Sequence, residues 1–347
     1  MAFMDRNPNK ARTRLRGIFH PELPGSTRGD SSNTRERKGR EPEKERRKQM
    51  SDESNVLTLK TLLGDYPNTL PLKKGEVRSP NIIFDFADVK LPNTAFKDVV
   101  RHLKYDVAEL AIVTYLQAKA HGKPIVLLPA VVVGALPHPF LVYNAERGRI
   151  SPADLKGKRV GIRAYSVTTA AWVRGVLQNE HGVDLNSINW VTLEDPHVAE
   201  YSDPPTAVRA PAGKSLAQML IDGEIDAGVV GGLDLKDVRL QPVIPNPNEA
   251  AQAWCKKHGA LPINHMLVVK ESLVKTNPAA VKEIFRVFRE SKQAMSPAGT
   301  ALDPIQFGLA NIRRSLELIV NYATQQGLIP KKFPVDDLFD DVTRNLI

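Results

Sequence analysis

Short apolar runs alternate with segments of helical period along most of this chain, and no other feature constrains the fold as strongly. Runs rich in Val, Ile and Leu that end at Gly, Pro or Asp predict strands, whereas longer amphipathic stretches predict helices. The predicted strands are 56–63, 82–87, 107–112, 125–133, 140–143, 159–162, 188–193, 227–230 and 265–269. The predicted helices are 94–104, 113–120, 166–181, 214–222, 249–258, 278–294 and 305–326. Because strands and helices alternate, we expect mostly parallel sheets covered by helices.

The alternating pattern occurs twice, which predicts an α/β protein with two lobes. Residues 55–145 are expected to form the first part of lobe 1, and residues 146–245 are expected to form lobe 2. Residues 246–347 are expected to return to lobe 1 and to add C-terminal helices, after a proline-rich stretch at 241–247. Two lobes joined by more than one crossing of the chain leave a cleft between them, and such a cleft is the usual place for a small ligand.

The first fifty residues differ from the rest in charge and in pattern. They hold 14 Lys/Arg and 7 Asp/Glu, which accounts for +7 of the formal net charge of +9, and they lack an apolar period. Such a segment cannot bury enough surface to offset the entropy of ordering, so we expect residues 1–54 to be a disordered basic tail. An alternative is that the natural start is Met50 and that the tail is an upstream extension of the reading frame.

Several function classes are disfavoured by the same features. The charges of the tail are not interleaved with aromatic residues and no recognition fold follows them, so no nucleic-acid partner is expected. The longest apolar window, Ile125 to Leu136, is interrupted by Pro129 and Gly134 and is too short for a membrane span. No secretory signal is recognisable, so we expect a cytoplasmic protein without a membrane partner. The glycine-rich motifs of nucleotide and nicotinamide sites are missing, so no cofactor is expected.

The single cysteine and the histidines do not form a metal motif. Cys255 has no second thiol nearby, and a buried inert thiol is the favoured interpretation. His138 and His265 could in principle join Asp65 or Glu194 around a metal ion, but no paired histidines four residues apart and no Cys/His cluster occur. The prediction is therefore that no metal is bound.

The segment GKRVGIRAYSVTTAAWVRGVL is the most informative for ligand binding. A strand ends before Arg163 and a helix begins near Ser166, so free backbone N–H groups at the start of that helix would face the cleft and bind an anion. Thr168 and Trp172 are four residues apart and would share a helix face beside the ligand. Arg163 is the predicted anion clamp, whereas Arg174 is expected to form an ion pair that supports the lobe.

Two further strand ends carry polar residues that could contact a ligand. Asp65 and Tyr66 follow Gly64 at the end of the first strand, where Asp65 could instead cap the next turn. Tyr115 follows the third strand and could stack on a ligand, or could be a core aromatic residue whose hydroxyl finds a partner. Both alternatives stay open at this point.

The order of these motifs resembles the 4,5-dihydroxyphthalate decarboxylase family over about residues 55–292. The motifs are Gly64-Asp65-Tyr66, DVAEL at 106–110, Thr114-Tyr115, His138 before a strand, DLKGKRVGI, Tyr165 with Thr168 and WVRG, GKSLAQMLIDGEIDAG, and Pro262-Ile263-Asn264-His265. The sequence differs from the family at Val230-Gly231-Gly232-Leu233-Asp234 and at Leu193-Glu194-Asp195, where one lobe would touch the ligand. The resemblance implies a two-lobed type 2 periplasmic binding protein-like fold with an inter-lobe cleft, preceded here by the disordered tail.

The resemblance also implies a reaction and a set of site residues. The reaction is non-oxidative decarboxylation of a hydroxylated aromatic dicarboxylic acid, of the type that converts 4,5-dihydroxyphthalate to protocatechuate, without a cofactor. A proton must replace the departing carboxylate, and His265 or His138 is expected to deliver it. The residues expected to bind the substrate are Asp65, Tyr66, Thr114, Tyr115, Arg163, Tyr165, Thr168, Trp172 and Glu194.

A second function class stays open beside the enzyme. A small-molecule solute-binding protein of a transporter or sensor has the same fold, and it would bind an aromatic acid or another carboxylate without turnover. In both cases the expected partner is a small aromatic acid, and a homo-oligomer is compatible with the sequence. The two classes differ in carbon dioxide release, which only the enzyme performs.

Overall fold

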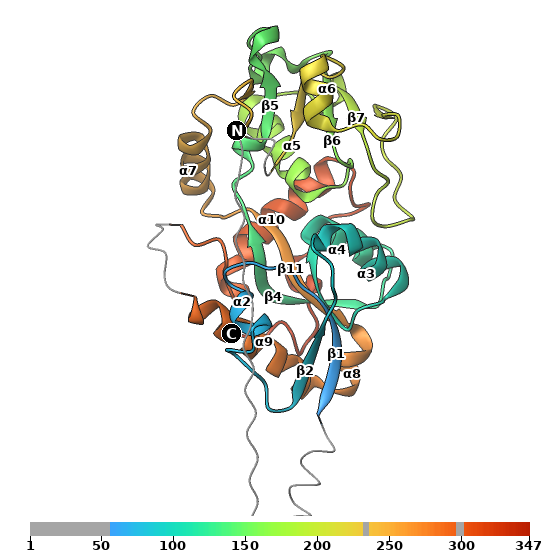
Figure 1. The fold of residues 1–347 in the computed structure, drawn as a ribbon, viewed down its shortest axis with the longest axis vertical. Helices are drawn as coiled ribbons and strands as arrows, with labels where there is room; N and C mark the ends of the chain where they lie inside the picture. The colour runs from blue at the N-terminus through green and yellow to red at the C-terminus, as the bar shows by residue number, and fades with distance from the viewer. Residues whose placement is uncertain (1–55, 232–235, 296–301) are drawn as a thin grey trace, which may run out of the picture. The chain divides into compact units, whose positions relative to one another are not determined.

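The computed structural model describes residues 56–231, 236–295 and 302–347 of the chain. The tail expected at 1–54 lies outside these residues, and so do Gly232, Leu233 and Asp234 of the segment that differs from the family. The described residues from 56 onward contain two β-sheets with helices packed around them (Figure 1).

Most of the predicted elements are present within a few residues of the expected bounds. The strands are β1 (Leu57–Leu62), β2 (Ile82–Phe86), β3 (Val107–Ala111), β4 (Ile125–Gly134), β5 (Leu141–Asn144), β6 (Arg159–Ile162), β7 (Asn189–Thr192), β8 (Ala207–Arg209), β9 (Ala227–Val229), β10 (Leu240–Pro242) and β11 (Ile263–Lys270). The α-helices are α2 (Leu70–Lys73), α3 (Phe96–His102), α4 (Ile112–Ala120), α5 (Thr168–His181), α6 (Leu216–Asp222), α7 (Pro247–His258), α8 (Glu271–Thr276), α9 (Pro278–Ala294) and α10 (Leu309–Gln325). The short elements β8, β10, α2 and α8 were not predicted.

The first sheet has five strands in the order β2-β1-β3-β11-β4. Strands β1, β2 and β3 pair in parallel, whereas β11 is antiparallel to both of its neighbours. Every residue of β3 is buried, which fits a central strand covered on both faces. The sequence of β3 is VAELA, so the fold carries Glu109 into the interior of this sheet.

The second sheet has six strands in the order β10-β5-β9-β6-β7-β8. Strands β6, β7, β8 and β9 are parallel, and β5 is antiparallel to both β9 and β10. The carboxyl ends of neighbouring parallel strands meet at one edge of a sheet. The residues that follow β6 and β7, among them Arg163 and Glu194, are therefore brought to the same edge.

The chain passes from the first sheet to the second and back again. It leaves the first sheet after β4 and enters the second at β5, so the crossing lies between Gly134 and Leu141, ahead of the expected boundary at residue 145. It returns through α7 and β11. Among the described residues, no helix combines the length and the apolar character needed to cross a membrane.

Helices α5 and α10 pack directly against each other, although they are far apart in the sequence (Figure 1). The contact centres on Gly175, because a Cβ atom at this position would lie 2.0 Å from Cδ2 of Tyr322. The Tyr322 ring also meets the Trp172 ring edge to face, with centroids 5.6 Å apart. The C-terminal helix α10 is therefore fixed against α5 at a point where only glycine fits.

Arg174 is buried at the same contact between α5 and α10, and it makes no ion pair within the described residues. Its buried guanidinium lies over the Tyr165 ring, donates a hydrogen bond to Gln326 Oε1 at 2.9 Å and donates another to the Tyr165 carbonyl at 2.6 Å. The expected ion pair is thus replaced by carbonyl acceptors and an aromatic face. The supporting role that was expected for Arg174 agrees with this arrangement.

We predict that Gly175→Ala destabilises the protein. The new methyl group must displace the Tyr322 ring, and overpacking of this kind costs about 1–3 kcal/mol of unfolding free energy. Urea denaturation of Gly175→Ala and of Lys282→Ala, an exposed position on α9, provides the measurement and its matched control. A Gly175→Ala protein as stable as the control would contradict the close contact.

Candidate active site

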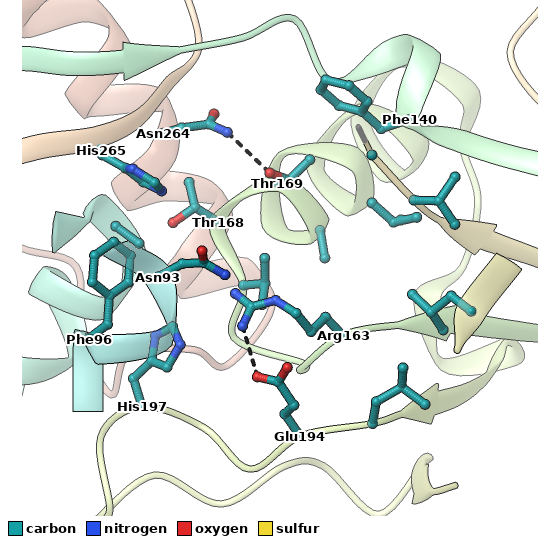
Figure 2. Close-up of a pocket in the computed structure, with 18 of the residues that line it drawn as sticks. Asn93, Phe96, Phe140, Arg163, Thr168, Thr169, Glu194, His197, Asn264 and His265 are labelled. Carbon is teal, nitrogen blue, oxygen red and sulfur yellow. Dashed lines mark hydrogen bonds and ion pairs between the residues drawn. The ribbon is translucent and has the colours of Figure 1, made fainter. Parts of the chain in front are cut away.

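A cavity of about 570 Å³ is lined by residues from both sheets, and this volume suits one substituted aromatic ring (Figure 2). The polar and aromatic side chains that line it come from the 3₁₀ helix η1 (Pro92–Ala95), from α3 and β11, from the segments that follow β6 and β7, and from the residues just before β5 and α6. They are Asn93, Phe96, Asn264, His265, Arg163, Thr168, Thr169, Glu194, His197, Phe140, Lys214 and Ser215. The cleft predicted between two α/β halves is therefore present.

The beginning of α5 forms one wall of the cavity. Thr168, Thr169 and Ala170 all line it, and no side chain caps the helix at Val167. The first backbone N–H groups of a helix have no partners within the helix, and the positive end of the helix dipole lies there. Because α5 has 14 residues, this end is a full helix terminus that can bind a carboxylate.

Hydrogen bonds hold the first turn of α5 against both sheets. Thr168 Oγ1 accepts a hydrogen bond from the Val113 N–H of α4 at 3.1 Å. Asn264 Nδ2, on β11, donates to Thr169 Oγ1 at 3.1 Å, as the dashed line in Figure 2 marks. Asn264 therefore links β11 to the first turn of α5.

Arg163 and Glu194 form an ion pair on the same wall. Arg163 Nη1 lies 2.8 Å from Glu194 Oε2, and both side chains are partly exposed (Figure 2). The backbone supports the pair, because the N–H groups of Leu193 and Glu194 both donate to the Arg163 carbonyl, at 2.9 and 2.8 Å. Arg163, the predicted anion-binding residue, thus faces the cavity, and one of its nitrogens is already paired with the Glu194 carboxylate.

His265 faces this wall from β11 and has a buried carboxylate behind it. Its Nδ1 lies 3.5 Å from Glu109 Oε1, and its ring meets the Phe96 ring edge to face with centroids 5.1 Å apart. Tyr66 does not line the cavity but donates its hydroxyl to the same Glu109 oxygen at 2.9 Å. The residues Tyr66, Glu109 and His265 therefore form a continuous polar chain that ends at the cavity.

His197 is a second cavity histidine, and sequence reasoning missed it. Its Nδ1 is 2.8 Å from Thr114 Oγ1, and burial together with the positive charge of Arg163 lowers its pKa to about 3. It is therefore neutral near pH 7. Thr114, which was expected to bind substrate directly, instead holds this ring. The only signal in the sequence was a histidine three residues after Glu194, in a segment without a predicted element.

The structure places four of the predicted site residues on the cavity and the others elsewhere. Arg163, Thr168, Glu194 and His265 line it. The others are behind the wall, in the core or on the surface: Tyr66 contacts Glu109, Thr114 contacts the lining residue His197, Tyr115, Tyr165 and Trp172 are buried, and Asp65 is exposed and pairs with Lys73.

Trp172 and Tyr115 have structural hydrogen bonds instead of ligand contacts. Trp172 Nε1 donates to the Ile263 carbonyl at 2.8 Å, which joins α5 to β11. The Tyr115 hydroxyl donates to the Leu338 carbonyl, and burial raises its pKa. For Tyr115, the structure therefore favours the core alternative.

His138, the second histidine expected in catalysis, does not line the cavity. It lies in a short 3₁₀ helix, His138–Phe140, where it is 2% exposed and packs against Trp254 of α7. Burial lowers its pKa to about 4. These surroundings correct the expected position of His138 and leave His265 as the predicted histidine that faces a ligand.

Metal ligands are not grouped in the part of the chain that the structure describes. Within residues 56–231, 236–295 and 302–347, no three His, Cys, Asp or Glu side chains are close enough together to hold an ion. Around the cavity, the functional groups are instead the Arg163–Glu194 ion pair, the Lys214 ammonium, two histidines, amide and hydroxyl groups and a helix N-terminus. This set can bind an anionic ligand and exchange protons with it.

Comparison with known proteins relates the chain to one group of enzymes. It is 32% identical over 251 residues to the 4,5-dihydroxyphthalate decarboxylase of Comamonas testosteroni, a match that covers 68% of this chain and 75% of that protein. It is 34% identical over 188 residues to the enzyme of the same name from Pseudomonas putida, covering 51% and 71%. The family model described as NMT1/THI5 like matches residues 90–203.

A solved structure confirms the predicted fold. The periplasmic aliphatic sulphonate binding protein SsuA from Escherichia coli matches with a TM-score of 0.54 and 12% identity, covering 84% of this chain and 98% of that one. At this identity the likeness concerns the fold alone. The predicted two-lobed α/β fold of the periplasmic binding protein type is therefore confirmed for the described residues.

We predict that His138 makes the protein less stable in acid. The unfolded chain binds a proton at this histidine below about pH 6.5, whereas the folded protein does not until about pH 4, so the unfolding free energy falls by about 1.4 kcal/mol per pH unit between these values. His138→Gln should remove the part of this pH dependence of the unfolding free energy that His138 contributes. The measurement is urea denaturation at several pH values between 4 and 7, with the exposed His102→Gln as the control. Equal slopes in both variants would show that His138 titrates normally.

Proposed function

Because the chain belongs to the 4,5-dihydroxyphthalate decarboxylase family, we propose that it releases carbon dioxide from a hydroxylated aromatic dicarboxylic acid bound in the cavity. The family is one of carboxy-lyases. The observation that carries the proposal is the arrangement of two different groups across one cavity: an anion-binding wall made by Arg163 and the start of α5, and a histidine, His265, on the other side.

The substrate's two carboxylates have different tasks in this arrangement. The carboxylate that stays on the ring binds to the free N–H groups of α5 and to Arg163, where both the helix dipole and the guanidinium favour negative charge. This contact fixes the ring in the cavity. The carboxylate that leaves then lies on the side of His265, where the Phe96 edge provides an apolar surface.

The reaction needs a proton and a route for electrons, and both are supplied without a redox step. A ring hydroxyl para to the departing carboxylate pushes electron density into the ring, and the ring carbon takes a proton from His265. The carbon–carbon bond then breaks, its electron pair returns to the ring and restores the aromatic system, and carbon dioxide leaves. His265 regains a proton from solvent. Histidine suits this transfer because its proton exchanges near neutral pH.

Polar groups of the remaining wall suit the hydroxyls of the substrate. His197 is neutral, and the side chain of Asn93 also lines the cavity. One nitrogen of the neutral His197 ring contacts the Thr114 hydroxyl, so the other nitrogen remains to hydrogen-bond a phenol hydroxyl of the substrate. A hydrogen bond of this kind favours the dihydroxylated acid over the unsubstituted one, because a buried polar group without a partner weakens binding.

Carbon dioxide release from a panel of acids tests the proposal. The panel contains 4,5-dihydroxyphthalate, phthalate, which lacks the hydroxyls, and 3,4-dihydroxybenzoate, which lacks one carboxylate. We expect turnover of the first acid and none of phthalate. Tight binding of these acids without any release of carbon dioxide would contradict the proposal and favour a solute-binding protein, whose fold this chain shares.

We predict that Arg163→Ala weakens binding of 4,5-dihydroxyphthalate far more than binding of 3,4-dihydroxybenzoate. A charge-assisted hydrogen bond contributes about 1.5–3 kcal/mol only where its partner exists, which corresponds to roughly 10- to 150-fold in affinity. Calorimetric titration with both ligands measures the difference. The control is Arg159→Ala, at the opposite end of β6, where the side chain pairs with Asp226. Equal loss for both ligands would show that Arg163 does not contact the distinguishing carboxylate.

We predict that His265→Asn and His138→Asn separate chemistry from folding. His265→Asn should slow turnover by about 10²–10⁴ while ligand affinity stays within a few-fold, because a proton donor acts mainly in the transition state. His138→Asn should lower stability and leave turnover per folded molecule near that of the wild type, because His138 does not line the cavity. Steady-state rates and ligand titrations are compared for both. Near wild-type turnover in His265→Asn would contradict the histidine mechanism.

A further inference from the structure

Glu109 is a buried carboxylate that neither the fold nor substrate binding explains. It lies on β3, whose five residues are all buried, and its side chain is 0% exposed. Burial of a charge is unfavourable unless the group is hydrogen-bonded and paired. A valine or leucine would suit the position equally well as part of a central strand. The carboxylate therefore points to a role in the adjacent cavity.

Both carboxylate oxygens of Glu109 accept hydrogen bonds. Oε1 accepts from the Tyr66 hydroxyl at 2.9 Å, and Oε2 accepts from the Gly64 N–H at 3.4 Å. Burial and the neighbouring Glu109 charge raise the pKa of Tyr66, so that the phenol remains a donor. These two donors fix the position of the carboxylate.

The positive partner of this carboxylate is His265. Within the described residues, the ion pair between Glu109 and His265 is the only one found for Glu109, with Oε1 and Nδ1 at 3.5 Å. Nδ1 is buried and has no hydrogen-bond partner at normal distance. The opposite ring nitrogen, Nε2, is then the one that remains for a ligand in the cavity that His265 lines.

Other charges near His265 do not compete with Glu109. His197 is neutral near pH 7. Arg163 is paired with Glu194, and Asp65, beside Tyr66, is exposed and paired with Lys73. Phe96 packs its ring edge to face against His265 and has no charge. Glu109 is therefore the charged group in direct contact with the imidazole.

We propose that Glu109, held in place by Tyr66, is a positioning residue that holds the His265 ring at Nδ1 and aims its Nε2 at the substrate. The inference rests on the proposed function. In the decarboxylation step a ring electron pair, pushed by the para hydroxyl, bonds the Nε2 proton to the ring carbon; the carbon–carbon bond then breaks, its electron pair returns to the ring, and carbon dioxide leaves. His265 becomes neutral, Glu109 remains a carboxylate, and solvent returns the proton to His265.

The first test compares Glu109→Gln with the wild type in steady-state kinetics. We expect kcat to fall at least about tenfold with KM within a few-fold, because the groups that orient a catalytic histidine contribute on this scale or more. A kcat of folded Glu109→Gln near the wild-type value, or a rise in KM as large as the fall in kcat, would overturn the proposal.

A second variant keeps the test decisive if Glu109→Gln does not fold. Tyr66→Phe leaves the carboxylate in place and removes only the hydrogen bond that fixes it, so kcat should fall less than in Glu109→Gln and again without a large change in KM. Wild-type kcat in folded Tyr66→Phe would overturn the part assigned to Tyr66. The matched control is Tyr105→Phe, a buried tyrosine that does not line the cavity.

A measurement without substrate separates this inference from the proposed function. The ¹⁵N signals of the His265 imidazole, assigned by their loss in His265→Asn, report which ring nitrogen carries the proton of the neutral ring. We expect it on Nδ1, which faces Glu109, in the wild type, and a shift toward Nε2 in Glu109→Gln. If the signals change in this way but the wild type releases no carbon dioxide, the proposed function fails and the Glu109–His265 pair stands. A wild-type ring that carries this proton on Nε2 would overturn the pair.

Discussion

The close contact between α5 and α10 at Gly175 and Tyr322 determines where the anion-binding wall lies. Tyr322 occupies the space that any side chain at position 175 would need, so its ring packs directly on the backbone of α5. Gln326, just after α10, accepts from Arg174 and donates to the Ala171 carbonyl. Arg174 in turn donates to the Tyr165 carbonyl, just before α5. Through these contacts the C-terminal helix sets the position of the first turn of α5.

The two sides of the cavity use polar groups in opposite ways. On the side of α5, the Arg163 side chain is 29% exposed, so a ligand can reach it without a large desolvation penalty. On the side of β11, the carboxylate of Glu109 is fully buried and its hydrogen bonds are internal. The exposed side suits recognition of an incoming anion, and the buried side suits control of one proton, because electrostatic interactions are stronger where water is excluded.

Sequence patterns predicted the fold and about half of the site, for identifiable reasons. Apolar runs revealed the long strands, whereas β8 and β10 have three residues each and are too short to show a strand pattern of apolar residues. Arg163 and Glu194 were predicted because they follow strands whose carboxyl ends meet. Helical spacing placed Trp172 on one face with Thr168, but it could not show that only the first turn of α5 reaches the cavity. His197 was missed because its partner, Thr114, is 83 residues away in the sequence.

The ion pair between Arg163 and Glu194 makes ligand binding an exchange of one carboxylate for another. The guanidinium already has a negative neighbour at 2.8 Å, so an incoming acid does not neutralise a free positive charge but replaces Glu194 as its partner. Glu194 is 44% exposed and can turn to water, which keeps the cost of the exchange small. The charge of the site then changes by about the charge of the ligand itself. Affinity at such a site depends on geometry more than on long-range attraction, and it is correspondingly less sensitive to ionic strength.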